Sequence, residues 1–474
     1  MNTFSAAVVN QTTTTENGMQ AFASTADALV DLFGKIGASR GKDIMPDFIA
    51  AFAQDQELAV RIALWARDVR EGAGERETFR KILKWLSQTN RDLLFRVLPL
   101  VPKLGRWDDL FIFNDAECKK AAYGLVRDAL LNNDGLCAKW CPREKSAKND
   151  IAAELIKFLG WTPKFYRKRL VELTKVVETQ MCANKWDDIN FSHVPSMAHK
   201  RYRSAFQKHT PKYAEYVGAL SKGDTSVKIN AGAIFPYDLL PYNSYYGIRD
   251  LNEVQRNSII AQWDALPNYI GSANVLPLVD VSGSMDQPAG KNTRLTCMAV
   301  AISLGLYFAD KNKGKFKDTF LTFSSEPQLL HLKGNVLEKF EQMIKSDWGM
   351  STDLHKAIQR ILDVAIQGNV PNEEMPKMLL ILSDMQFNYC VVYNDRALDM
   401  IRRKYEQAGY TMPQVVFWQL NAKDNVPVQH NENGVALVSG FSAAITKSLL
   451  ETDGVDFTPT GVMMKTIMKD RYSF

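Results

Sequence analysis

The residues with the clearest chemical potential are an aspartate and two serines in the string DVSGSM, at residues 280–285. Asp280, Ser282 and Ser284 set one carboxylate and two hydroxyls on a tight turn that Gly283 permits. These are hard oxygen ligands, the kind that Mg²⁺ and Mn²⁺ prefer. Three interpretations are open: a metal site, a catalytic serine, or a turn whose side chains only bond to nearby backbone.

Two further residues favour the metal site. The string GMSTDLHKA offers Thr352 at the expected start of a helix, and LLILSDMQF offers Asp384 at the end of an apolar strand. In an open α/β sheet, ligands bind outside the carboxyl ends of the strands, and Asp280 also follows such a strand. The sequence therefore predicts a divalent-cation site, for Mg²⁺ with Mn²⁺ as the alternative, held by Asp280, Ser282, Ser284, Thr352 and Asp384.

Catalysis is not expected from these residues. The motif reads Val-Ser-Gly-Ser rather than Gly-x-Ser-x-Gly, and no histidine adjoins it as a base. His355, three residues after Thr352, is expected on a helix surface. A metal-dependent nuclease or phosphatase would gather more carboxylates around its ions than this site offers. We therefore do not expect an enzyme.

Two patterns of apolar residues position these groups. From residue 20 to 268, strings such as DALVDLFGKIGA and RETFRKILKWLSQ carry apolar residues at spacings of three and four, which predicts an all-α domain of helical repeats. From residue 269 to 474, short apolar runs alternate with helical patterns, which predicts a doubly wound α/β domain. The expected strands are ANVLPLVDVS, KDTFLTFSS, PKMLLILSDM, PQVVFWQL and GVALVSG. Residues 1–19 are expected to form a flexible segment.

The positive charge of the chain is concentrated in one segment. The net charge of the whole chain is only +5, yet residues 135–212 hold 16 Lys and Arg against 7 Asp and Glu, a net of +9. Strings such as HKRYRSAFQKHTPKYAEY interleave these cations with aromatic residues, the combination that single-stranded nucleic acids require. The candidate RNA-binding residues are Lys139, Arg143, Lys145, Lys148, Lys164, Arg167, Lys168, Arg169, Lys200, Arg201, Arg203, Lys208 and Lys212.

A plainer interpretation of the basic segment stays open beside the first. A run of charge along a helix is often its solvated face, and the aromatic residues can belong to the core. For any single residue of the segment the two interpretations weigh equally. For the segment as a whole, the net charge favours the binding of a polyanion.

The metal motif resembles that of a known fold. Asp-x-Ser-x-Ser, followed by a Thr-Asp turn and a later Asp, resembles the metal-ion-dependent adhesion site (MIDAS) of von Willebrand factor A domains. Here GMSTD stands where Gly-Gly-Thr-Asp is usual, so that Met350 and Ser351 precede Thr352. The order of the expected strands and helices from about residue 272 onward is also similar to that fold.

The whole chain resembles the family of the Ro 60-kDa autoantigen, whose helical part is the TROVE module. Four strings also resemble a related, poorly characterised family of plants, fungi and large viruses: ALWARDVREGAGERETFR, LGRWDDL, VPSMAHKRYRSAFQKH and SVKINAGAIFPYDLL. The resemblance implies a HEAT-like helical ring closed by the von Willebrand factor A-type domain. It also implies a monomeric ribonucleoprotein component that binds single-stranded RNA ends in the ring and small structured RNAs on its outer surface, without covalent chemistry.

The loop VREGAGERE is expected to lie between two helices of a repeat. It lacks the Gly-Lys-Ser/Thr of a nucleotide-binding P-loop, and no strand precedes it. Gly72 and Gly74 are expected to end the first helix, and Arg70 and Arg76 are candidates to face the interior of the ring.

A second hypothesis belongs to a different class of function. A cation at Asp280 would leave a coordination position that an Asp or Glu of a protein partner can fill. The chain would then be a metal-dependent interaction or assembly module without an RNA function.

The expected location is the cytoplasm. The first eighteen residues lack the basic and apolar regions of a secretory signal, and no apolar run approaches the roughly 20 residues that cross a bilayer. We therefore expect no membrane partner. The Cys137 and Cys141 pair is not followed by further cysteines or histidines at zinc-site spacing, so a structural zinc is not expected.

Overall fold

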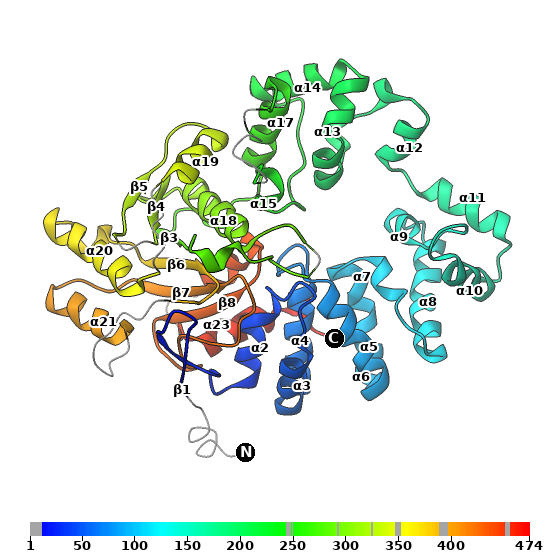
Figure 1. Ribbon diagram of the computed structural model, residues 1–474. Helices are drawn as coiled ribbons and strands as arrows, with labels where there is room; N and C mark the ends of the chain where they lie inside the picture. Colours follow the sequence, from blue (N-terminus) through cyan, green and yellow to red (C-terminus); the bar gives the residue numbers. More distant parts are fainter. Residues whose placement is uncertain are drawn as a thin grey trace.

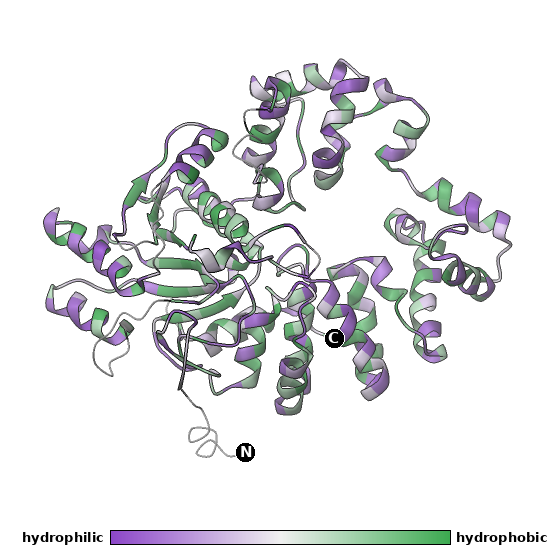
Figure 2. Ribbon diagram, viewed as in Figure 1, coloured by the Kyte–Doolittle hydropathy of each residue, from purple (hydrophilic) through white to green (hydrophobic). Residues whose placement is uncertain are grey.

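The structure of the protein is a computed structural model. It describes residues 12–242, 248, 250–291, 293–323, 326–346, 352–387, 397–450 and 456–474. A helical region forms an arc that leaves an α/β domain, curves away and returns to it (Figure 1). Figure 2 shows hydrophobic residues along the central strands and both hydrophilic and hydrophobic residues within the outer helices. The fold class predicted from the sequence is confirmed.

A small hairpin precedes the helices. Strands β1 (Thr12–Thr14) and β2 (Gln20–Phe22) pair antiparallel, and Phe22 bridges to Val426 of the α/β domain. The segment 1–19 was predicted to be flexible; its residues 12–19 contain β1 and the turn that leads to β2, and residues 1–11 lie outside the described part. Met19 is buried in the core of the α/β domain, and such a contact is invisible to local sequence patterns.

Amphipathic helices make up the arc, and many begin at a residue whose side chain accepts backbone N–H groups, such as Asp27, Asp55, Asp115 and Thr162. The α-helices are α2 (Ala28–Ile36), α3 (Met45–Gln54), α4 (Gln56–Arg67), α5 (Glu77–Thr89), α6 (Arg91–Val97), α7 (Val101–Leu104), α8 (Ala116–Leu131), α9 (Gly135–Trp140), α10 (Asn149–Leu159), α11 (Pro163–Leu173), α12 (Val177–Cys182), α13 (Ser196–His209), α14 (Lys212–Ser221), α15 (Pro236–Leu239) and α17 (Glu253–Asp264). Short 3₁₀ helices are η1 (Leu98–Leu100), η2 (Trp107–Leu110), η3 (Trp186–Asp188) and η4 (Phe191–His193).

The α/β domain contains a six-stranded sheet with the order β5-β4-β3-β6-β7-β8. All pairs are parallel except β4 with β5. The strands are β3 (Val275–Val279), β4 (Thr319–Thr322), β5 (Leu329–His331), β6 (Met378–Ser383), β7 (Gln414–Gln419) and β8 (Val435–Ser439). Five of them lie in the five predicted strings. The sixth, β5, is a short edge strand with an exposed and half-buried pattern, and its sequence carries no long apolar run.

Helices cover both faces of the sheet. The helices are α18 (Cys297–Lys311), α19 (Val336–Lys345), α20 (Leu354–Gln367), α21 (Ala397–Gln407), α22 (Thr446–Leu450) and α23 (Pro459–Ile467), with 3₁₀ turns η5 (Gly283–Asp286), η6 (Asn372–Glu374), η7 (Ala443–Ile445) and η8 (Asp470–Tyr472). Leu380 and Leu382 of β6 join the core that includes α18, whereas Leu379 and Ile381 join the core of α20 and α21. This alternation follows from the two-residue period of a strand.

Both ends of the arc are packed against the α/β domain. At the first end, Ser439 of β8 accepts a hydrogen bond from the backbone N–H of Gly37 (3.0 Å) and donates one to the carbonyl of Phe33 (2.9 Å). At the other end, the indole N–H of Trp263 donates to Asp310 of α18 (2.9 Å). The core of the first helices is continuous with one face of the sheet, so the elements form a closed circuit rather than two separate bodies.

Candidate metal site and central cavity

The predicted metal-site residues lie where the strand order of the sheet reverses. Strands β3 and β6 are neighbours, and Asp280 and Asp384 directly follow Val279 and Ser383, the last residues of these strands. In doubly wound sheets this reversal point, at the carboxyl ends of the strands, is the usual place for a ligand. The parallel register therefore brings together two aspartates that are 104 residues apart in the sequence.

The Asp280 carboxylate is held through both of its oxygens. Its Oδ1 accepts the backbone N–H of Ser282 (2.9 Å), and its Oδ2 accepts the hydroxyl of Ser383 (2.5 Å). The residue is completely buried. Burial, with a smaller contribution from the charge of Asp384, raises the pKa of Asp280 to about 6.

The serine hydroxyls connect the two aspartates. Ser282 and Ser284 lie with their hydroxyl oxygens 3.1 Å apart, and Ser284 donates to Oδ1 of Asp384 (3.2 Å). The other oxygen of Asp384, Oδ2, is buried and has no hydrogen-bond partner within the described chain. Burial also raises the pKa of Asp384. An unpartnered buried carboxylate oxygen is costly unless a cation or a donor completes it.

Thr352 joins the same site from the start of α20. It is fully buried, and its hydroxyl donates to the carbonyl of Gln386 (3.0 Å), two residues after Asp384. Asp353 caps α20 by accepting the N–H of Lys356 (2.9 Å). Met350 and Ser351, which distinguish GMSTD from the usual motif, lie outside the described residues.

The arrangement fits a hard divalent cation. The donors are all oxygens, two of them carboxylates, and Asp384 supplies an unpartnered acceptor among them. The described residues contain no group of three or more His, Cys, Asp and Glu side chains that could bind a metal ion. The described residues around Asp280 therefore match a site of mixed hydroxyl and carboxylate ligands. They do not form the carboxylate cluster of a two-metal enzyme.

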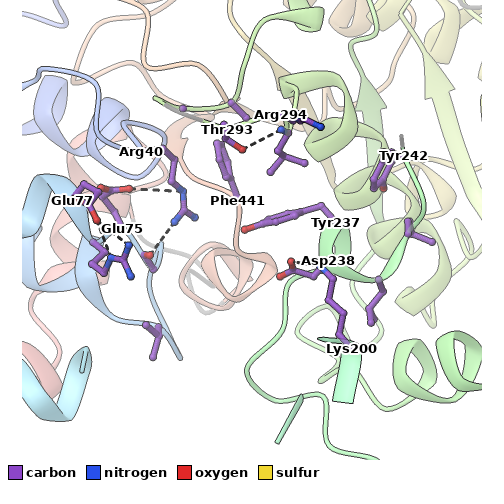
Figure 3. Close-up of a pocket in the computed structure, with 18 of the residues that line it drawn as sticks. Arg40, Glu75, Glu77, Lys200, Tyr237, Asp238, Tyr242, Thr293, Arg294 and Phe441 are labelled. Atoms are coloured by element: carbon purple, nitrogen blue, oxygen red, sulfur yellow. Dashed lines mark hydrogen bonds and ion pairs between the residues drawn. The ribbon is translucent and has the colours of Figure 1, made fainter. Parts of the chain in front are cut away.

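A large cationic cavity lies where the two ends of the arc meet the α/β domain (Figure 3). Its volume is about 920 Å³. Its wall comes from the first helices, from residues near α15 and from the loop that follows η5. Eight cationic residues line it, Arg40, Arg67, Arg76, Arg106, Lys200, Arg203, Lys291 and Arg294, against three acidic residues, Glu75, Glu77 and Asp238.

Several of these cations already have acidic partners. Lys200 pairs with Asp238 (2.6 Å), and Arg76 pairs with Glu77 (2.9 Å). By contrast, Arg203, Lys291 and Arg294 have no carboxylate partner within the part of the chain that the structure describes. One NH group of Arg203 is buried without any hydrogen bond there, and burial lowers the pKa of its guanidinium. The cavity therefore has uncompensated positive charge.

The predicted RNA-binding residues are distributed over several surfaces. Only Lys200 and Arg203 line the cavity. Arg143 donates to the carbonyl of Ala138, and Arg167 pairs with Glu144. The exposed members of the set, on the helical surface, are Lys145, Lys148, Lys164, Arg167, Lys168, Arg201, Lys208 and Lys212, while Lys139, Arg143 and Arg169 are half-buried.

The aromatic residues of the basic segment mostly belong to the core. Tyr166, Phe206 and Tyr213 are almost completely buried, and the Trp140 ring lies against Arg106, 4.0 Å from its guanidinium carbon. Phe165 is the large aromatic side chain of the set that is well exposed, at 50%. The plainer interpretation was therefore correct for most of these aromatic residues.

The loop VREGAGERE contributes to the cavity. Arg76 lines it, as expected for a residue facing the interior, and Arg70 lines a smaller neighbouring cavity of about 370 Å³. Gly74 has a φ of +70°, and an added Cβ would lie 3.0 Å from the Phe235 ring. The sequence alone does not single out Arg40, Lys291 or Arg294, because these cations lie outside the basic segment 135–212.

A closed arc of helices and a doubly wound α/β domain with a candidate cation site define the class of this protein. The helical region matches the model "Domain of unknown function (DUF2828)" over residues 15–101 and 161–273, and the α/β domain matches "Domain of unknown function (DUF7788)" over residues 274–471. The uncharacterized protein L728 of Acanthamoeba polyphaga mimivirus is 31% identical over 514 residues, covering 96% of this chain and 86% of its own. The chain belongs to the family of that mimivirus protein.

Solved structures also match this chain. The Ro (RSR) protein of Deinococcus radiodurans aligns with 94% of this chain and 100% of its own, at 13% identity and a TM-score of 0.38. No described helix is long and apolar enough to cross a membrane.

Proposed function

We propose that the protein binds RNA and that its central cavity receives single-stranded RNA ends. The observation that carries the proposal is the cavity wall, on which Arg203, Lys291 and Arg294 lack carboxylate partners in the described chain. Phosphate groups would neutralise these cations and release counterions, which is the main source of affinity for nucleic acids. The sequence resemblance to the Ro family points in the same direction.

The cavity also offers surfaces for unpaired bases. Phe235 and Tyr237 stack with ring centroids 5.4 Å apart, and both rings are half-buried in the region of the two neighbouring cavities. The Arg40 guanidinium lies over the Phe441 ring at 4.7 Å, which gives a further planar group. Bases of single strands stack on such aromatic and guanidinium planes without sequence preference.

Small structured RNA would bind the outer helical surface. The exposed cations there lie on the solvent side of α11 and α13 and in the turn before α10, and they include Lys148, Lys164, Lys168, Arg201 and Lys208. A duplex is too wide to follow a single strand into the cavity, so backbone contacts along the surface are the expected mode. We propose no covalent step for either RNA, and the protein is proposed to act as a monomeric ring in the cytoplasm.

The test of RNA binding is filter binding of the full chain to an RNA with a single-stranded 3′ end and to a blunt duplex, over a range of salt. Replacing both Lys291 and Arg294 with Gln should weaken binding of the single-stranded RNA and lower its salt slope by about 1.4, or about 0.7 for each lost phosphate contact. The matched control replaces two exposed surface residues, Lys148 and Lys164, with Gln. This control should weaken duplex binding more than single-strand binding.

Three results would contradict this proposal. No RNA retained at low salt would exclude RNA binding. An unchanged affinity of the cavity variant for single-stranded RNA would remove the cavity from the mechanism. RNA cut at defined positions in the presence of Mg²⁺ would show that the protein is an enzyme.

We also propose that Asp280, Ser282, Ser284, Thr352 and Asp384 hold Mg²⁺ or Mn²⁺. The unpartnered Oδ2 of Asp384 supports this second proposal. A bound cation would supply a Lewis-acidic position that a carboxylate can fill. The segment that starts at Asp280 continues to Ala289, Gly290 and Lys291 in the cavity wall, so the site would also fix part of the RNA cavity.

The alternative function is metal-dependent protein interaction without RNA. It also rests on the unpartnered Asp384 oxygen, which suits a site that awaits an acidic partner. Pull-downs with the wild type and with Asp280→Ala separate the two functions. A protein partner lost in the variant, from a preparation whose absorbance ratio at 260 and 280 nm shows no nucleic acid, favours the alternative. RNA that copurifies with both proteins favours RNA binding by the cavity.

A further inference from the structure

The smaller cavity of about 370 Å³ adjoins the central one. Five residues line both cavities, namely Val69, Gly74, Arg106, Tyr237 and Asp238. Pockets that bind small ligands span about 300–1,000 Å³. The smaller cavity therefore has the size for a single nucleoside rather than for a run of nucleotides.

The loop of residues 231–234 brings unpartnered backbone groups to this cavity, which all four of its residues line. Ala231 is 3% exposed and Ile234 is 8% exposed. Nevertheless, the N–H of Ala231 and the carbonyl of Ile234 have no hydrogen-bond partner in the described part of the chain. Backbone groups at buried positions are nearly always paired, so these groups suit a ligand that offers both donors and acceptors.

Both ends of this loop are held in place. Before it, the side-chain amide of Asn230 donates to the carbonyls of Ser192 (3.0 Å) and Val194 (2.9 Å). After it, the backbone N–H of Phe235 donates to the carboxylate of Asp238 (3.3 Å). The free backbone groups are therefore positioned before any ligand arrives, which lowers the entropic cost of binding.

A tyrosine hydroxyl and two stacked rings complete the wall. Tyr269 is half-buried, and its hydroxyl has no partner among the described residues. Burial raises the pKa of this hydroxyl, so it stays protonated and able to donate at neutral pH. Phe235 and Tyr237, whose ring centroids lie 5.4 Å apart, add flat apolar surface.

Arg70 adds a cation to the same wall. Its side chain is exposed and has no acidic partner within the ranges that the structure describes. Arg106, by contrast, is paired with Asp108 (2.9 Å). The cavity thus combines flat rings and free hydrogen-bonding groups with a single unpaired cation, which are the groups that a nucleotide requires.

We propose that the smaller cavity binds the last nucleobase of a single-stranded RNA and recognises its hydrogen-bonding edge. This inference rests on the proposed entry of RNA into the central cavity. Loop 231–234 and the Tyr269 hydroxyl bind the base edge, and Arg70 binds the adjoining phosphate. Stacking alone carries little sequence information, whereas hydrogen bonds to a base edge distinguish one base from another. The protein therefore has a preference for the base at the end of the strand.

The test uses five oligouridine RNAs that differ only at the 3′-terminal nucleotide, which carries A, C, G, U or no base. Filter binding of the full chain should show at least about a fivefold difference between the preferred and the least preferred base, within the range that one hydrogen bond contributes. The RNA without a terminal base should bind at least as weakly as the least preferred one.

Tyr269→Phe removes the hydroxyl and keeps the ring. It should weaken binding of the preferred RNA about fivefold and leave binding of the RNA without a terminal base unchanged. Arg70→Gln should weaken binding of all five RNAs and lower the salt slope by about 0.7, while their order stays the same. The matched control is Tyr202→Phe on α13, which lines neither cavity and should leave all five affinities unchanged.

The possible failures are distinguishable. Equal affinity of the wild type for all five RNAs would overturn the inference while RNA binding stands. A base preference that survives Tyr269→Phe unchanged would overturn it too, because the recognition would then lie elsewhere. If the wild type retains none of the five RNAs at low salt, the inference and the proposed function fail together.

Discussion

Replacing Asp280 with asparagine is expected to stabilise the metal-free protein and to abolish its stabilisation by Mg²⁺. Burial raises the pKa of this carboxyl from 3.8 to about 6, so its ionised form is unfavourable in the folded protein. Since one pKa unit corresponds to about 1.4 kcal/mol, ionised Asp280 costs the folded state about 3 kcal/mol at pH 7. An asparagine can still accept the N–H of Ser282 and can donate to the hydroxyl of Ser383.

The sign of the pH dependence follows from the same shift. Because the folded pKa is raised, the unfolded chain loses its proton first, and the metal-free protein loses stability as the pH rises from about 4 to about 6. The advantage of the asparagine should therefore be complete above pH 6 and should vanish near pH 4. A bound cation would offset the same cost in the wild type.

The assay is thermal unfolding of both proteins in EDTA and in excess Mg²⁺ at several pH values. An unfolding entropy of about 2.1 cal/mol/K per residue gives about 1 kcal/mol/K for the chain, so the melting temperature in EDTA should rise by about 3 °C at pH 7. The matched control is Asp286→Asn, an exposed residue on the adjacent 3₁₀ turn, which should change little. A lower melting temperature for Asp280→Asn in EDTA, or an undiminished rise with Mg²⁺, would refute the reasoning.

Two further predictions concern the helical region. Gly37→Ala should destabilise the protein by about 1–3 kcal/mol in a urea titration, because an added Cβ would press against the backbone carbonyl of Ser439 where the arc meets β8. The control Gly124→Ala, with open space around it inside α8, should be neutral or stabilising in the same titration. Asp109→Asn should cost about 3–5 kcal/mol by leaving buried Arg67 without its charged partner at 2.7 Å, and equal stability of variant and wild type in urea would contradict this.

The candidate metal-site residues could be proposed from the sequence because each one follows a local signal. Asp280 and Asp384 each follow an apolar run of strand length, and parallel strands end at one edge of their sheet. The contacts that complete the site could not be predicted in the same way. Ser383 and Gln386 carry no signal of their own in the sequence, because their contacts with Asp280 and Thr352 form only in the folded chain.

The charge count of the basic segment predicted only part of the cavity wall. The excess of Lys and Arg over residues 135–212 pointed to a polyanion, and two of its members, Lys200 and Arg203, do line the cavity. Other members form ion pairs, such as Arg167 with Glu144. Whether such a pair forms depends on how close the two side chains lie in the folded chain. A charge count cannot distinguish a paired guanidinium from a free one.

The order of residues along the chain was sufficient for the helical region and for five of the six strands, because helix faces and strand runs depend on neighbours in the sequence. It also indicated five candidate ligands for a cation. The cavity depended on the closure of the arc. Arg40, Arg203 and Arg294 come from three distant segments, and only the packing of α2 on β8 and of Trp263 on α18 brings their charges to one wall. Long-range packing of this kind has no periodic signature in the sequence, and it decided where the uncompensated charge of this protein lies.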